Sequence, residues 1–456
     1  MVTVQSPAPA PSAPGQPPGS VRAAPRRRRP GQLAAATTPT LLRILMIILL
    51  LASLAWGAVG AWAVSQHASA AQDVVSTSEP LSLSAQQMYR SLSDADVTAA
   101  TEFLSSPDPS LQARQRYEAD IAQAATDLTS LNAAATVSDR QLLASLDAVS
   151  TGLPVYKGYV TQAQTWYKFG YLLTGSSFMQ DATEVMHLTL LPAARAIYAQ
   201  ENAGLTTASA QATGLPWIVV VLVLALAIGV VLFRAQRWLW HHTHRRVNYG
   251  LLGASLVLVV GVLWLVVAFA VARSDLQQGT GHGSTPAETL AQAAIDAQQI
   301  RGDELINLIS RSGDGTFVQD FKTVRGQLGP GAGTLLASAA ATSPSGAGAQ
   351  WAAAAGRDVQ AWYRVNEQAY ALDGAARYLQ ETQLVTGLGP GNSTAGFNQV
   401  EADLSRAIGA DQVIFQGSAT SGENAFTGLE AGIIVVAVLM ALGCAWGLNI
   451  RLAEYR

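Results

Sequence analysis

The spacing of the histidine and cysteine residues in this 456-residue chain does not favour a metal-binding site or a catalytic nucleophile. Its one cysteine is Cys444. Outside the central 234–248 segment no two histidines have the spacing of zinc ligands, and no Walker, nucleophile-elbow or dinucleotide-binding motif is present. His241, His242 and His244 could hold a metal, but they share their segment with four arginines, which favours a solvated patch. We therefore predict no catalytic residue, no metal site and no cofactor, and expect a protein that is not an enzyme.

Aromatic pairs are the candidate recognition residues. They are Trp166 with Tyr167 and Trp362 with Tyr363, each within a long helix-forming segment. Trp and Tyr are common at binding hot spots, although burial in a helix bundle is the competing interpretation of each pair. Direct capture of an amino acid would instead need an arginine to bind its carboxylate. The candidates for that role are Arg90, Arg114, Arg116, Arg195, Arg301, Arg325, Arg364 and Arg377.

A short basic segment at 234–248 contains the candidate output residues. These are Arg234, Arg237, Trp238, Trp240, Arg245 and Arg246. The segment joins two long apolar stretches, so it would receive any movement that those stretches transmit. Anchoring of the two tryptophans at a membrane surface is the competing interpretation, because Trp is enriched at the boundary between lipid and water.

Four apolar runs must position these residues. They cover 41–64, 215–233, 249–272 and 430–450, and each is long enough to cross a bilayer as a helix, at roughly 20 residues per crossing. A cleaved signal peptide is the competing interpretation of the first run, because Ala68-Ser69-Ala70 resembles a cleavage site. The length of the apolar run and of the leader before it favours an uncleaved anchor. The sequence predicts a four-pass protein.

Charge orients the chain. Arginines precede the first run, fill the 234–248 loop and follow the last run, and cationic loops stay in the cytoplasm. The large segments are acidic, with 14 acids against 7 bases at 65–213 and 15 against 8 at 274–428. We expect a plasma-membrane protein with both termini, the Pro/Arg-rich disordered tail 1–40 and the tail 451–456 in the cytoplasm, and with two extracytoplasmic domains at 65–213 and 273–428.

Both large segments read as helical, because they are rich in Ala, Gln, Leu and Glu and contain few alternating β-branched runs. Turn-forming residues divide each segment into four stretches, with breaks predicted at Glu79-Pro80 and at 175–177 among others. The fold class predicted is therefore an all-α membrane protein, with two tandem extracytoplasmic four-helix bundles, each flanked by a pair of spans that continue its outer helices.

Short sequence similarities between the halves favour an internal repeat. Ala85-Gln86-Gln87 resembles Ala297-Gln298-Gln299, and Trp166-Tyr167-Lys168 resembles Trp362-Tyr363-Arg364. The similarities occur in the same order in each half, between comparable spans. We therefore predict that the span, bundle and span unit has been duplicated.

The tandem arrangement resembles bacterial four-helix-bundle chemoreceptor sensors that lack their signalling rods, and residues 41–456 are similar to the actinobacterial GlnX membrane proteins. That resemblance implies two partners. One is GlnH, a glutamine-type solute-binding lipoprotein outside the cell, and the other is PknG, a cytosolic Ser/Thr protein kinase. The protein would then relay external glutamine, glutamate or aspartate to a kinase that controls glutamate metabolism.

A structural or accessory subunit that scaffolds a transporter or an envelope complex is the alternative function. Transport itself is disfavoured, because the four runs contain no ionisable residue at depth. The bilayer is an expected partner, nucleic acid is not, and a homodimer remains open. The acidic domains favour sensing through a partner protein over direct capture of an anionic amino acid.

Overall fold

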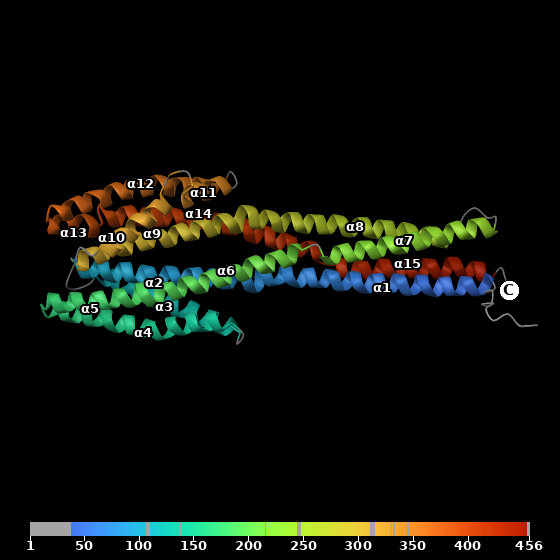
Figure 1. The fold of residues 1–456 in the computed structure, drawn as a ribbon, viewed down its shortest axis with the longest axis horizontal. Coiled ribbons are helices and arrows are strands. Elements are labelled where there is room, and N and C mark those ends of the chain that lie inside the picture. The colour runs from blue at the N-terminus through green and yellow to red at the C-terminus, as the bar shows by residue number, and fades with distance from the viewer. Residues whose placement is uncertain are drawn as a thin grey trace, which may run out of the picture.

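A computed structural model describes residues 38–105, 110–136, 139–214, 216–243, 248–310, 315–329, 331, 333–343 and 346–453. These residues are almost entirely helical, and they contain no strand. The molecule is a long rod, with the apolar helices at one end and the two bundles side by side at the other (Figure 1). The predicted fold class, an all-α protein with four membrane-spanning helices and helical bundles, is confirmed.

Four helices in the described part of the chain are long and apolar enough to cross a membrane. The spans are provided by α1 (Thr38–Asp73), α7 (Pro216–Thr243), α8 (Tyr249–Gly279) and α15 (Leu429–Ala453). They pack around one apolar cluster that includes Trp56, Leu258, Met440 and Cys444. The chain is therefore a multi-pass membrane protein.

Glycines allow α8 and α15 to approach closely. A Cβ atom added to Gly250 would lie 2.4 Å from the Cα atom of Gly447, so no side chain fits there. Asn248 donates a hydrogen bond from Nδ2 to the carbonyl oxygen of Gly447 at 2.9 Å. Small residues at such crossings let apolar helices gain dispersion energy in a solvent as apolar as themselves.

The first bundle follows α1. It consists of α2 (Glu79–Ser105), α3 (Leu111–Ala134), α4 (Arg140–Lys168), α5 (Leu172–Val185) and α6 (Leu191–Thr213), with a π-helical turn, η2 (Met186–Leu190), between the last two. Ser110 begins α3 as an N-cap, because its Oγ atom accepts a hydrogen bond from the backbone N–H of Ala113 at 3.1 Å. The break expected at 175–177 is wrong: the chain turns at Phe169–Tyr171 and Gly175 lies inside α5.

The second bundle follows α8. It consists of α9 (Thr285–Ser310), α10 (Gly315–Leu328), α11 (Leu335–Thr342), α12 (Ala347–Gly374), α13 (Tyr378–Thr386) and α14 (Ser393–Phe426). The chain between α13 and α14, residues 387–392, is not helical, whereas the π turn η2 joins α5 directly to α6 in the first bundle. Two short helices, α10 and α11, together replace the single long α3.

The spans that lead into the bundles are continuous with them. Between α1 and α2 the helix passes through a π turn, η1 (Val74–Ser78), and between α8 and α9 through another, η3 (Thr280–Ser284). The break expected at Glu79-Pro80 is therefore wrong, because Pro80 occupies the second position of α2, directly after η1. The returning helices are interrupted, at Gly214 before α7 and at Gly428, with φ of +80°, before α15.

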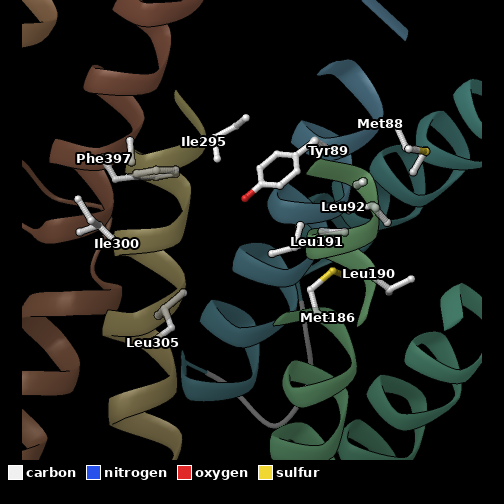
Figure 2. Packing of buried hydrophobic residues seen from close by; sticks show 14 of the residues in the cluster. Met88, Tyr89, Leu92, Met186, Leu190, Leu191, Ile295, Ile300, Leu305 and Phe397 are labelled. Carbon is white, nitrogen blue, oxygen red and sulfur yellow. The ribbon is translucent and has the colours of Figure 1, made fainter. Parts of the chain in front are cut away.

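The bundles pack side by side, chiefly through α2 against α9, with further contacts of α5 with α9 and of α13 with α2 (Figure 1). One cluster of buried apolar side chains extends across both. In Figure 2, Tyr89 of α2 and Ile295 of α9 point toward one another between Met88 and Leu92 on one side and Phe397 on the other. The bundles therefore form one body with a shared core.

Candidate functional site

Trp362 and Tyr363 lie inside the second bundle. Trp362 is fully buried and its Nε1 atom donates a hydrogen bond to Ser393 Oγ at 2.8 Å. Tyr363 is also buried, and its hydroxyl donates to the carbonyl oxygen of Arg325 at 3.1 Å. Neither side chain can touch a partner while the bundle is closed. The structure corrects their predicted placement and supports the competing interpretation, core packing.

Trp166 and Tyr167 lie at the end of α4 that is distant from the spans. Trp166 is 38% exposed and packs edge-on against the ring of Tyr171, with centroids 5.6 Å apart. Tyr167 is half-buried and its ring lies 5.0 Å from that of Phe103. Of the two predicted pairs, only the first reaches the surface.

The turns show which residues correspond between the bundles. Tyr171 donates its N–H to the carbonyl oxygen of Trp166 at 3.0 Å, and Arg377 donates its N–H to that of Leu372 at 2.9 Å. The counterpart of Trp166 is therefore Leu372, 206 residues later, and not Trp362. By the same separation Trp362 corresponds to Tyr156, and both are fully buried.

The other predicted similarity is also out of register. At a separation of 206 residues Pro80 corresponds to Pro286, and the π turns that precede them, η1 and η3, both contain five residues. The partner of Ala85-Gln86 is then Ala291-Gln292, rather than the Ala297-Gln298 that the sequence comparison selected. Ala85 and Ala291 are both buried.

A buried polar network surrounds the 387–392 segment between α13 and α14 in the second bundle. Arg301 is fully buried, pairs with Glu304, and donates from Nη2 to the carbonyl oxygen of Val385 at 3.2 Å and to Thr394 Oγ1 at 2.8 Å. Ser393 donates to Glu304 Oε2 at 2.7 Å. Arg301 thus joins both ends of the 387–392 segment to α9. At the corresponding position the first bundle has Ala95.

A polar layer links the bundles. Arg90 on α2 donates from Nη2 to Glu401 Oε1 on α14 at 2.7 Å, and Arg116 on α3 lies 4.0 Å from the second oxygen of the same carboxylate. Gln298 on α9 donates from Nε2 to Asp94 Oδ1 at 3.0 Å. Burial, together with the charge of Glu401, raises the pKa of Asp94 to about 8. This layer joins the two bundles and places a carboxyl group of raised pKa between them.

A histidine lies where η2 meets the second bundle. His187 contacts Asp96 through Nε2 at 3.3 Å, and a Cβ atom added to Gly302 on α9 would lie 2.8 Å from the imidazole Cε1. Burial lowers the pKa of His187, but the hydrogen bond and charge of Asp96 outweigh burial, so that the pKa is raised. Close packing on Gly302 makes this contact sensitive to any shift of α9.

The predicted output residues lie at the far end of α7 and beyond it. Arg234 and Arg237 are exposed, and Trp238 is half-buried against the cluster of the spans. Trp240 belongs to α7, but its side chain, like the whole of Arg245 and Arg246, is outside the described residues. Nothing in the structure tests the output role, which stays a prediction.

Comparison with known proteins supports a sensor. Residues 70–210, which extend from the end of α1 almost to the end of α6 and contain the first bundle, match the family of the actinobacterial sensor domain. No curated protein and no solved structure matches the chain. The match and the four spans together describe a membrane protein with a sensing or signalling role.

Proposed function

We propose that the chain is a non-enzymatic transmembrane relay. It couples an extracytoplasmic amino-acid-binding lipoprotein, of the glutamine, glutamate or aspartate type, to a cytosolic Ser/Thr protein kinase that controls glutamate metabolism. The match of the first bundle to a sensor domain supports the sensing part of this proposal. The resemblance to the GlnX family suggests the two partners.

Helical continuity is the observation that carries the proposal. From Thr38 to Ser105 the chain is helical without interruption, and from Tyr249 to Ser310 it is so again. A continuous helix transmits a translation or rotation of about 1–2 Å, the size of helix shifts in known switches. Because the returning helices are interrupted at Gly214 and Gly428, α1 and α8 are the rigid paths from bundle to span, and α8 begins at the basic loop.

The π turns fit a coupling role. A π turn inserts one residue into an α-helix, which alters the rotational phase between the segments on either side, and such turns are frequent at functional sites. Here η1 and η3 lie at the junctions of span and bundle in both halves. We infer that the halves arose by duplication, since the turns and the following prolines keep a separation of 206 residues.

The test is a measurement of kinase output in cells. Replacement of Arg245 and Arg246 by alanine should abolish the change in phosphorylation of the kinase substrate that follows addition of glutamate, while membrane insertion is retained. The matched control replaces Arg140 and Arg364, two exposed arginines of the bundles. A normal response in the loop variant contradicts the relay. Loss of assembly with permease or envelope proteins instead indicates the scaffold.

A further inference from the structure

The hairpin between α4 and α5 presents an apolar surface at the end of the molecule that is distant from the spans (Figure 1). Phe169 is 71% exposed and Leu173 is 84% exposed. Trp166, Tyr171 and Leu172 beside them are exposed as well. An apolar patch of this kind on the water-facing part of a protein marks an interaction site.

The hairpin is rigid. The N–H groups of Phe169 and Tyr171 donate to backbone carbonyls of the last turn of α4 at 3.2 and 3.0 Å, and Gly170 supplies the φ of +85° that the turn needs. A Cβ atom on Gly175 would lie 3.0 Å from the carbonyl oxygen of Ala163, so that glycine lets α5 pack closely on α4. The aromatic side chains are therefore preorganised for binding.

The matching hairpin of the second bundle borders an open groove. Ala376 has a φ of +55° at the position of Gly170, so the backbone turns in the same way. The smaller Leu372 and Ala375 stand at the positions of Trp166 and Phe169, and an open groove of about 760 Å³ lies beside them. Its lining includes Gln368, Leu372, Arg377, Gln380, Gln383 and Asn392. Amide side chains both donate and accept hydrogen bonds, which suits a polypeptide backbone.

We propose that these two hairpins form one docking surface for a soluble extracytoplasmic protein, whose apolar patch covers the 166–173 hairpin and whose extended segment lies in the groove. The proposal rests on the relay function and names the site of its external partner. A partner that spans both hairpins also spans both bundles. Its binding or release then acts directly on the polar layer between Arg90 and Glu401.

Charge selects the kind of partner. Lys168 is the single charged residue among positions 158–180, in a segment that is acidic as a whole, and Arg377 lies in the groove. Opposite charges around an apolar centre guide association and fix orientation. The partner surface is therefore an apolar patch bordered by carboxylates.

Position excludes lipid and disfavours a second copy. The 27 residues of α2 separate the hairpin from the end of α1, about 40 Å at 1.5 Å per residue. Copies in one membrane stand parallel to each other, with their distal ends facing away from the bilayer. The surface is thus open to a protein that approaches from above.

The experiment places a photo-crosslinking amino acid at Leu173 in the full chain in native membranes, and in a second sample at Val413, which is 69% exposed on α14. The protein captured from Leu173 is purified and its dissociation constant for the chain in nanodiscs is measured. Leu173→Glu should weaken binding at least about tenfold and Lys168→Glu about threefold, with the latter effect reduced by salt. Val413→Glu should leave the dissociation constant unchanged.

Support requires all of these effects and a crosslinked peptide that lies in an acid-bordered apolar patch. Capture of a second copy, equal capture from Leu173 and Val413, or unchanged binding by Leu173→Glu overturns the docking surface. If the unsubstituted surface captures no protein at Leu173 and the Leu173→Glu variant still responds to glutamate, the docking surface is overturned and the relay stands. If a protein is captured at Leu173 and Leu173→Glu no longer binds it but gives a normal kinase response, the docking surface stands and the relay fails.

Discussion

At the residue scale, burial distinguishes aromatic side chains that look alike in the sequence. Trp362 donates to Ser393 inside the second bundle, whereas Trp166 lies on an exposed hairpin. The same two-residue pattern, Trp-Tyr, thus belongs to a core in one bundle and to a surface in the other. Aromatic content by itself does not identify a recognition site.

Trp362→Ala should reduce the free energy of unfolding by about 3–5 kcal/mol, because it removes a fully buried indole and leaves a cavity. Trp166→Ala serves as the matched variant and should cost about 1 kcal/mol or less, since much of its side chain is already in water. Denaturant unfolding of the detergent-solubilised chain measures both. Equal losses would show that the hairpin contributes to the core.

Asp94→Asn should flatten the pH dependence of stability. Its pKa in the folded protein, about 8, is above the ordinary 3.8, so the folded state binds this proton more tightly than the unfolded chain does. The stabilisation that this bound proton contributes is complete below the ordinary pKa and is lost as the pH rises through about 8. Asparagine keeps the oxygen that accepts from Gln298 and does not ionise.

The melting temperature of the wild type should therefore fall between about pH 5 and about pH 8, and that of the asparagine variant should fall less. Gln112→Glu, on the exposed side of α3, provides a control for the general effect of surface charge. Parallel curves for the wild type and Asp94→Asn would mean that other groups govern the dependence.

At the element scale, glycine positions decide how closely the spans pack. Gly250 and Gly447 bring α8 and α15 into backbone contact, and Gly253 on the same helix has no atom within 4 Å of its Cβ position. Helix periodicity indicates a span in either case. Only the neighbouring helix makes one glycine necessary and the other replaceable.

Gly250→Leu should destabilise the spans by at least about 1–3 kcal/mol, because a side chain there overlaps the backbone of α15. Gly253→Leu should change stability little, since its Cβ position is open. Thermal unfolding in detergent, measured as the loss of soluble monodisperse protein on heating, distinguishes the two variants. A tolerated Gly250→Leu would mean that α8 and α15 are farther apart in the membrane.

At the scale of the whole molecule, the two bundles share a core and a polar layer, so that a movement of one bundle changes the contacts of the other. This coupling requires side-chain contacts between segments separated by some 200 to 310 residues, such as Asp94 with Gln298 and Arg90 with Glu401. Signals from either bundle therefore act on both pairs of spans.

A short bis-maleimide bridge between cysteines at positions 94 and 298 should lock the bundles together. We expect the glutamate-dependent change in kinase output to fall at least about fivefold. The control bridge joins positions 118 and 157, where Glu118 and Lys157 link α3 to α4 within the first bundle at 3.5 Å. The native Cys444 is buried and does not compete. Full responsiveness of the 94–298 bridge would exclude relative motion of the bundles as the signal.

The amino-acid sequence by itself determined the four spans and the helical class, because hydropathy and helix propensity act over one segment at a time. Propensity did not reveal that η1 carries the helix past Pro80, or that the hairpin turns at Gly170 rather than at Gly175. The tertiary structure alone decided that Trp362 is buried and that Phe169 and Leu173 are exposed. It also decided that Arg90 contacts Glu401. Each of those outcomes depends on which distant segment packs against the residue, and long-range packing is not encoded in local sequence pattern.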